Sequence, residues 1–406
     1  MKTNHNIYIG ASQQMTKTKD SSIDLVVTSP PYPMIEMWDE IMASQNPDIS
    51  NYLEKEPDKA FELMHQELDK VWKECFRVIK PGGFLCVNIG DATRTINGNF
   101  MLYNNHSRIS KACIELGFVG LPNIIWRKQT NAPNKFMGSG MLPCGAYVTL
   151  EHEWILIFRK GEKRIYKTAE AKLGRMESSF FWEERNIWFS DVWDIKGTKQ
   201  NLQKTNIRER SAAYPLEVPF RLRHMFTQKG DTVLDPLLGT GTTMQAAILT
   251  GRNSCGYDID ANFESVIREG INGLDIDLCN SSIKKRFDAH KTFIVEREKS
   301  GKDVKHFNNT LNYKVMTKQE SEIELNYLTS IVCKDNGEYI VCYEDCSDLS
   351  SLPFKEKIFS NLYICDLAMK YVRLICFVGC VVCICVFYYL TKTYRFTFYM
   401  LNLLYQ

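Results

Sequence analysis

Residues 233–243 read V-L-D-P-L-L-G-T-G-T-T, and this stretch decides the fold. Its apolar start predicts a short buried strand, and its glycine-rich middle predicts a tight loop that leads into a helix at Thr242. Gly239 and Gly241 let the backbone approach a ligand closely, and the first turn of the helix offers unpaired N–H groups. Taken alone, the pattern G-x-G also occurs in ordinary turns between a strand and a helix.

Two acidic residues beside this loop narrow the choice of ligand. Asp235, at the strand tip, can receive a cationic or amine-bearing group, and Asp258, at the end of the next strand, can accept ribose hydroxyls. A dinucleotide site needs a third glycine where this chain has Met244, and an ATP loop needs Gly-Lys before Ser or Thr, which the stretch lacks. The nucleotide-like ligand that remains is S-adenosylmethionine (SAM).

A second loop, S29-P-P-Y32, follows the apolar strand predicted over residues 21–27. Ligands of open α/β sheets bind at such carboxyl ends of strands. Pro30 and Pro31 cannot continue a sheet and fix the direction of the Pro30 carbonyl, while Ser29 offers a short polar group and Tyr32 a flat stacking face. The set suits a planar heterocycle with an exocyclic amine. The alternative is a proline-rich turn with a packed tyrosine.

The exocyclic amine of a base is a poor nucleophile, because its lone pair is delocalised into the ring. Hydrogen bonds from the amine to the Ser29 side chain and the Pro30 carbonyl draw the nitrogen toward tetrahedral geometry. Its lone pair then points at an electrophilic methyl group. The expected catalysis is positioning and electrostatics, without a covalent intermediate.

Strands and helices alternate around these loops, which predicts an α/β domain with a mostly parallel sheet. The expected helices cover residues 57–79, 216–226 and 242–249. The expected strands cover residues 6–10, 21–27, 84–89, 123–127, 154–158, 232–234 and 253–257.

Five motifs occur in a defined order: T28-S-P-P-Y32, V78-I-K-P-G-G-F-L-C-V-N-I-G-D91, E151-H-E-W-I-L-I-F-R-K160, the 233–243 stretch and G256-Y-D-I-D260. Over residues 5–275 this order resembles the beta-type amino-DNA methyltransferases, in which the catalytic loop precedes the cofactor loop. The resemblance implies a Rossmann-like, SAM-dependent methyltransferase sheet that is circularly permuted, with a small inserted target-recognition region.

The S-P-P-Y form of the catalytic loop is similar to the cytosine-N4 members. Family members often carry an acid near the cofactor adenine where Gly10 is followed by Ala11 and Ser12, so that contact is not carried over. We assign catalysis to Ser29, Pro30, Pro31 and Tyr32, and SAM binding to Asp235, Pro236, Gly239, Thr240, Gly241 and Asp258.

The expected activity is methylation of cytosine N4 in a specific double-stranded DNA sequence, with the target base flipped out of the duplex. Such enzymes commonly partner a restriction endonuclease. Adenine-N6 methylation by the same chemistry is one alternative. A catalytically inactive DNA-binding or membrane-tethered protein is another.

Composition agrees with a soluble globular protein. The 406 residues carry 50 Lys and Arg against 48 Asp and Glu, which excludes a globally basic nucleic-acid binder. The N-terminus lacks the apolar region of a signal peptide, and 14 dispersed cysteines suit a reducing compartment, so we expect a cytoplasmic protein.

We expect five regions: a catalytic half (1–158), a target-recognition region (159–207), a SAM-binding half (208–275), a charged extension (276–346) and an apolar, cysteine-rich tail (347–406). The tail is an appended segment or a single membrane anchor, since residues 374–391 carry no charge.

Residues 159–210 contain 13 Lys and Arg and 8 Asp and Glu, a local excess of positive charge that suits DNA contact. A β-rich subdomain with a charged surface is the alternative. The interleaved aromatic residues are Tyr166, Phe180, Phe181, Trp182, Trp188, Phe189 and Trp193.

Weaker candidates have simpler interpretations. Cys144 is expected to be a buried or loop cysteine, His152 a strand-end histidine, and Cys380-x-x-Cys383 no metal site. Four arginines, Arg208, Arg210, Arg221 and Arg223, are either phosphate contacts or part of a solvated helix face.

Overall fold

The computed structural model describes residues 1–128, 137–197 and 214–345. The expected tail (347–406) and the arginines Arg208 and Arg210 lie outside these ranges. Within them, no helix combines the length and the apolar character that a bilayer crossing requires.

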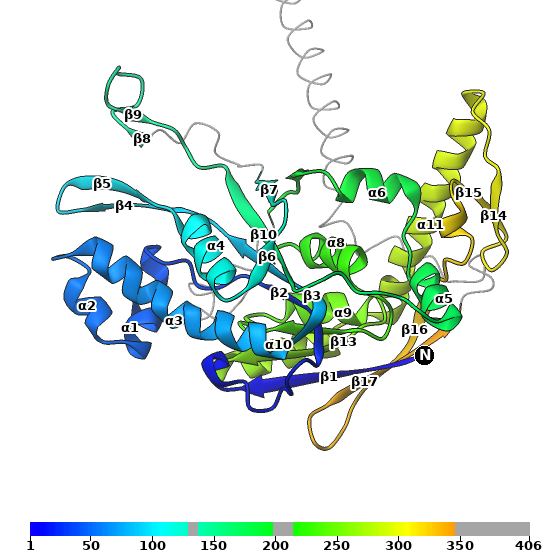
Figure 1. The fold of residues 1–406 in the computed structure, drawn as a ribbon, viewed down its shortest axis with the longest axis horizontal. Coiled ribbons are helices and arrows are strands. Elements are labelled where there is room, and N and C mark those ends of the chain that lie inside the picture. Colours follow the sequence, from blue (N-terminus) through cyan, green and yellow to red (C-terminus); the bar gives the residue numbers. More distant parts are fainter. Residues whose placement is uncertain (129–136, 198–213, 346–406) are drawn as a thin grey trace, which may run out of the picture. The chain divides into compact units, whose positions relative to one another are not determined.

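A mixed sheet of eleven strands supports the structure (Figure 1). Five parallel strands lie side by side in its centre, in the order β3 (Ile79–Ile89), β2 (Ile23–Thr28), β12 (Thr232–Asp235), β13 (Asn253–Asp258) and β1 (Lys2–Ile9). The first strand of the chain therefore pairs with a strand from the SAM-binding half, as the permuted order implies.

Mostly antiparallel strands extend both edges of the sheet. Beyond β3 lie β10 (His152–Lys160), β7 (Ile124–Arg127) and β11 (Val192–Asp194), and β6 (Phe118–Gly120) also pairs with β10. Beyond β1 lie β17 (Tyr339–Asp345) and β16 (Asn326–Cys333) from the expected charged extension. The protein thus has the predicted Rossmann-like α/β fold, widened at its β1 edge by the extension.

Helices cover both faces of the central strands. On β2, Val26 packs into the cluster that includes α3 (Pro57–Val78), whereas Leu25 and Val27 pack into the cluster that includes α8 (Glu217–Phe226). Successive strand residues point to opposite faces, so a strand covered on both sides is a continuous apolar run. This explains why residues 23–27 are almost uniformly apolar.

The carboxyl ends of β2 and β12 meet in the middle of the sheet. From β2 the chain crosses to β3 on one side, and from β12 it crosses through α9 (Thr242–Ile248) to β13 on the other side. Ligands of open α/β sheets bind at such a switch point. The two loops singled out in the sequence follow β2 and β12, so the fold brings them together here.

Two hairpins project from the catalytic half (Figure 1). They consist of β4 (Ala92–Ile96) with β5 (Asn99–Tyr103) and of β8 (Met137–Gly138) with β9 (Ala146–Tyr147), and Phe100 stacks on Tyr147 across them. The remaining elements of residues 1–128 and 214–272 are η1 (Ser12–Gln14), η2 (Glu36–Trp38), α1 (Asp39–Gln45), α2 (Asp48–Tyr52), α4 (Asn105–Glu115) and α10 (Asn262–Asn272).

The described part of the expected target-recognition region contains two helices, α5 (Ala169–Glu177) and α6 (Trp182–Trp188), and ends in β11. Three of its aromatic side chains are buried, so they stabilise the core and are not available to a ligand. They are Phe181, Trp188 and Trp193.

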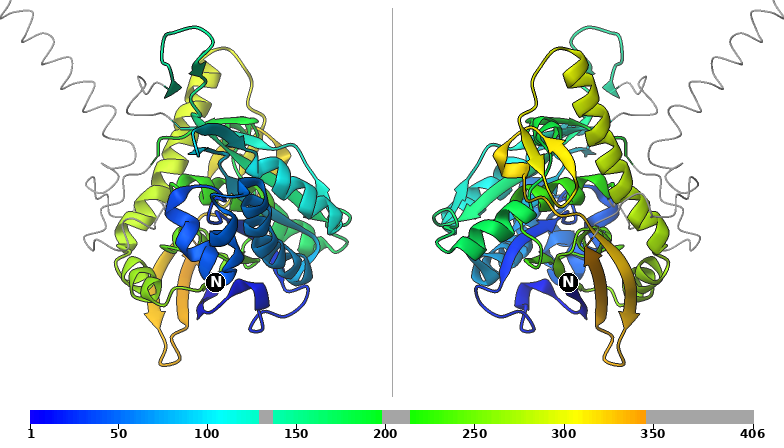
Figure 2. Two further views of the ribbon diagram at one scale, coloured as in Figure 1. Left: turned by 90° about the vertical axis from the view of Figure 1, so that its left-hand side faces the viewer. Right: turned by 90° about the vertical axis from the view of Figure 1, so that its right-hand side faces the viewer.

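The long helix α11 (Ile276–Lys299) packs against α6 and β16 (Figure 2). Arg286 on α11 forms an ion pair with Glu184 on α6, and the ring of His290 stacks on that of Phe181 with centroids 4.0 Å apart. Between α11 and β16 the chain forms β14 (His306–Asn308), β15 (Tyr313–Val315) and η3 (Lys318–Glu320). Residues of two expected regions therefore share one apolar cluster; the boundaries between regions stay a prediction.

The interpretation of Arg221 and Arg223, the two arginines on α8, as phosphate contacts or part of a solvated helix face was wrong. Arg221 is 9% exposed, pairs with Glu217 and lies over the Trp193 ring at 5.0 Å. Arg223 is fully buried and donates to the Pro219 carbonyl at 2.8 Å. Neither forms a solvated face or contacts phosphates, because α8 turns both toward the core.

Candidate active site

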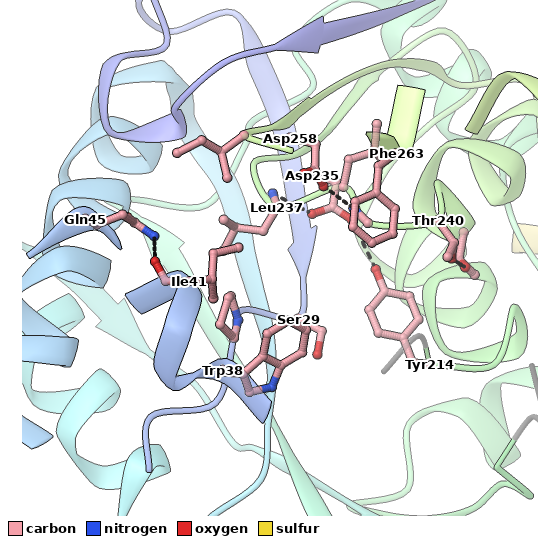
Figure 3. Close-up of a pocket in the computed structure, with 15 residues that line it drawn as sticks. Ser29, Trp38, Ile41, Gln45, Tyr214, Asp235, Leu237, Thr240, Asp258 and Phe263 are labelled. Atoms are coloured by element: carbon pink, nitrogen blue, oxygen red, sulfur yellow. Dashed lines mark hydrogen bonds between the residues drawn. The ribbon is translucent and has the colours of Figure 1, made fainter. Parts of the chain in front are cut away.

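A cleft of about 800 Å³ opens where β2 and β12 end (Figure 3). Aromatic side chains from outside the two predicted loops, Trp38, Tyr214 and Phe263, form part of its wall. Of the predicted site residues, Ser29, Pro31, Asp235, Gly239, Thr240 and Asp258 line the cleft, and Pro30, Tyr32, Pro236 and Gly241 belong to the same loops without lining it.

The two glycines of the cofactor loop adopt the left-handed conformation that favours glycine. Their φ angles are +53° at Gly239 and +80° at Gly241. A Cβ at Gly241 would lie 3.0 Å from the Ile267 side chain, so the packing of α10 leaves little room there. A Cβ at Gly239 would meet no atom within 4 Å, so the backbone at Gly239 is open to a ligand.

Asp258 ties the cofactor loop to the end of β13. One carboxylate oxygen accepts the Gly239 N–H at 2.8 Å, and the other accepts the Asp260 N–H at 3.0 Å. Burial raises the pKa of Asp258 to about 6. Each oxygen keeps a free lone pair, so the same carboxylate can also accept ribose hydroxyls.

Asp235 is a buried carboxyl group at the bottom of the cleft, 3% exposed. Its oxygens accept the Leu237 N–H at 3.1 Å and the Tyr214 hydroxyl at 3.4 Å (Figure 3). They also accept the Thr243 hydroxyl at 2.6 Å. Burial raises the pKa of Asp235 to about 7. A buried carboxylate of this kind gains when a cation binds beside it.

These features fit SAM. The cofactor carries an ammonium and a sulfonium charge, which suit Asp235, and ribose hydroxyls, which suit Asp258. Apolar surface from Leu237, Ile259 and Phe263 is available to its planar adenine. When bound, SAM supplies an electrophilic methyl group to the cleft.

The catalytic loop is anchored by a buried polar network. The Tyr32 hydroxyl donates to Glu153 Oε2 at 2.9 Å and lies 3.2 Å from Ser29 Oγ. Asn88 Nδ2 donates to the same Glu153 oxygen at 2.7 Å and to the Tyr32 hydroxyl at 2.9 Å. Lys128 Nζ contacts the other carboxylate oxygen of Glu153. Residues on or next to strands β3, β7 and β10 therefore hold the S-P-P-Y loop in one orientation.

The Tyr32 ring lies against the glycine that follows β3. A Cβ at Gly90 would come within 3.0 Å of Tyr32 Cε2 and 3.4 Å of Glu153 Cγ. Burial and the neighbouring Glu153 raise the pKa of Tyr32 well above its usual value, so its hydroxyl is neutral at physiological pH. The glycine near the end of the V78–D91 motif therefore has a steric role beside the catalytic loop.

Sequence reasoning missed several residues of this site, among them Tyr214, Asn88, Glu153 and Lys128. Tyr214 lies 21 residues before Asp235 and has no local motif. A weak signal existed for Asn88, a lone amide in the apolar run F84-L-C-V-N-I89, and for Glu153, an acid near the start of a strand. The antiparallel pairing of β10 with β3, in which Ile155 faces Asn88, brings the two together.

The weaker candidates lie elsewhere. His152 is partly exposed at the start of β10, with its ring edge on Trp154, and Cys144 is exposed in the turn between β8 and β9. In the described ranges, no three His, Cys, Asp or Glu side chains gather as a metal ion requires.

Comparison with known proteins identifies the family. Residues 23–269 match the family model N6_N4_Mtase, described as DNA methylase. The type II methyltransferase M.MthZI of Methanothermobacter thermautotrophicus is 50% identical over 348 residues, which cover 85% of this chain and 96% of that protein. The type II methyltransferase M.MjaI of Methanocaldococcus jannaschii is 50% identical over 281 residues, 66% of this chain and 91% of that protein.

A solved structure supports the cofactor. A Thermus thermophilus protein described as a putative DNA modification methylase, crystallised with S-adenosyl-L-methionine, is 31% identical with a TM-score of 0.51, over 66% of this chain and 92% of that one. The chain belongs to the N6/N4 DNA methylase family and is a SAM-dependent DNA amino-methyltransferase.

Proposed function

We propose that the protein methylates the exocyclic N4 amine of cytosine within a specific double-stranded DNA sequence, in the cytoplasm, as the modification enzyme of a type II restriction-modification system. The name that its relatives carry supports the type II assignment. The S-P-P-Y form of the catalytic loop supports the choice of cytosine.

The observation that carries the proposal is the position of Ser29. Its side chain lines the same cleft as Asp235 and Gly239, so a base held at Ser29 lies beside the cofactor site. Ser29 and the Pro30 carbonyl accept hydrogen bonds from the target amine and draw the nitrogen toward tetrahedral geometry. These bonds strengthen as the amine nitrogen gains positive charge, so they favour the transition state over the ground state.

A base inside the duplex cannot reach this cleft, so the target cytosine must leave the stack. Tyr32 then offers its ring for stacking, an interaction worth roughly 1–3 kcal/mol per base. Because the Tyr32 hydroxyl is tied to Glu153 and Asn88, the ring is ordered before the base arrives.

Mass spectrometry of nucleosides tests the base assignment. The purified protein is incubated with DNA and SAM that carries a deuterated methyl group, and the DNA is digested. Labelled N4-methylcytosine is the expected product. Labelled N6-methyladenine in its place overturns the cytosine assignment, and single-molecule sequencing of the same DNA identifies the recognition sequence.

A further inference from the structure

We propose that Ser29, Tyr32 and Glu153 form a proton relay that carries the proton released by the target amine away from the cleft. The inference rests on the proposed function, because it follows the proton that amine methylation sets free. Glu153 touches no substrate and acts through Tyr32, so it is a positioning residue.

Hydrogen-bond chemistry fixes the direction of the relay. An ionised Glu153 carboxylate can only accept, so the Tyr32 hydroxyl donates its single proton to Glu153 Oε2, at 2.9 Å. At the 3.2 Å contact with Ser29, Tyr32 must then accept and Ser29 must donate. Asn88 Nδ2 faces one lone pair of Ser29 Oγ at 3.4 Å, and the other lone pair is left to accept the N–H of the target amine in the cleft. Every link therefore points from the substrate toward Glu153.

The surroundings of Glu153 keep this direction. Glu153 is 8% exposed and Asn88 is 3% exposed, so little water competes for Oε2. The groups that face Glu153 are the Tyr32 hydroxyl from the catalytic loop, Asn88 Nδ2 from β3 and Lys128 Nζ next to β7. Both nitrogen groups donate, and Tyr32 has a raised pKa, so it passes a proton on as a neutral hydroxyl.

The relay balances the reaction. As the bond between the amine nitrogen and the methyl carbon forms, the carbon–sulfur bond breaks and its electron pair goes to sulfur. The nitrogen would then hold one proton too many. That proton passes to Ser29 Oγ, the Ser29 proton passes to the Tyr32 oxygen, and the Tyr32 proton passes to Glu153 Oε2. The products are a neutral methylated amine, two neutral hydroxyls and a protonated Glu153.

Two variants interrupt the relay at different links. Glu153→Gln removes the acceptor while keeping the size of the side chain, and Tyr32→Phe removes the hydroxyl while keeping the stacking ring. Glu151→Gln, on the same segment and outside the network, is the matched control for loss of one negative charge. Single-turnover methyl transfer is measured at saturating SAM and DNA, in H₂O and in D₂O, with both affinities determined separately.

We expect Glu153→Gln and Tyr32→Phe each to lower the single-turnover rate by about 100-fold or more, the contribution that general-base help commonly makes. Both should also abolish the solvent isotope effect of the wild type. The double variant should be no slower than the slower single variant, because both changes break one chain. Glu151→Gln should keep the wild-type rate and isotope effect.

A folded Glu153→Gln protein with the wild-type rate and isotope effect overturns the relay. So does a loss confined to SAM or DNA affinity, which a merely structural role produces. If Glu153→Gln fails to fold, Tyr32→Phe gives the same test. The identity of the methylated base is read from the wild type alone, so a wrong base assignment and a wrong relay are distinguished.

Discussion

Replacing Asp235 with asparagine should stabilise the free protein while weakening its hold on SAM. Burial raises the pKa of Asp235 from 3.8 to about 7. The folded state therefore keeps the proton of the Asp235 carboxyl group over a pH range in which the unfolded chain has lost it. The resulting contribution to stability is complete below about pH 4 and is lost progressively as the pH rises to about 7. At about 1.36 kcal/mol per pH unit, the loss reaches about 4 kcal/mol.

Asparagine removes this titration with little change in shape. Its oxygen can still accept the Leu237 N–H, and its amide can donate to the Thr243 hydroxyl. The Thr243 hydroxyl can in turn donate to the Val27 carbonyl, which lies 3.4 Å away. The stability of Asp235→Asn relative to the wild type should therefore grow by about 3 kcal/mol between about pH 5 and pH 8. Other carboxyl groups, Asp258 included, are present in both proteins, so the difference isolates Asp235.

Urea unfolding of the SAM-free proteins at these two pH values, followed by circular dichroism, measures this difference. Calorimetry should show that the variant binds SAM about 10- to 100-fold more weakly, because a charged hydrogen-bond partner worth roughly 1.5–3 kcal/mol is lost. A stability difference that is the same at both pH values would refute the reasoning. An unchanged SAM affinity would remove Asp235 from the cofactor site.

Three further outcomes are expected. Asp258→Ala removes the acceptor of the Gly239 N–H and should weaken SAM binding by about 1–3 kcal/mol in calorimetry; an unchanged dissociation constant excludes Asp258 from the site. Gly90→Ala places a Cβ 3.0 Å from Tyr32, a strain of about 1–3 kcal/mol, and should slow methylation with SAM affinity intact; a wild-type rate contradicts this steric role. A chain that ends at Asp345 should keep SAM binding and methylation, and a folded truncation that binds no SAM counts against it.

Local chemistry made much of the site predictable from the sequence. Gly239, Gly241 and the two prolines at 30 and 31 have backbone requirements that only certain turns meet, and apolar runs locate the strands before them. Alternating strands and helices then place both loops at one edge of a parallel sheet. The position of Ser29 in the same cleft as Asp235 follows from this topology.

Contacts between distant segments were beyond sequence reasoning. Glu153 reaches Tyr32 only because β10 pairs with β3 in one register, and the sequence near Glu153 does not encode that register. The pairing of β17 with β1 joins opposite ends of the described chain, such as Thr3 with Val341. Arg223 is a further example: its charge suggested a position at the protein surface, but its side chain is fully buried.

The measurement that tests the central claim most directly is the single-turnover rate of Ser29→Ala at saturating SAM and DNA. If Ser29 accepts the target amine, the variant should be folded, bind SAM and DNA as the wild type does, and transfer methyl about 10- to 100-fold more slowly, as expected for a lost hydrogen bond to a developing charge. A full rate per folded molecule would contradict the assignment of this loop as the active site.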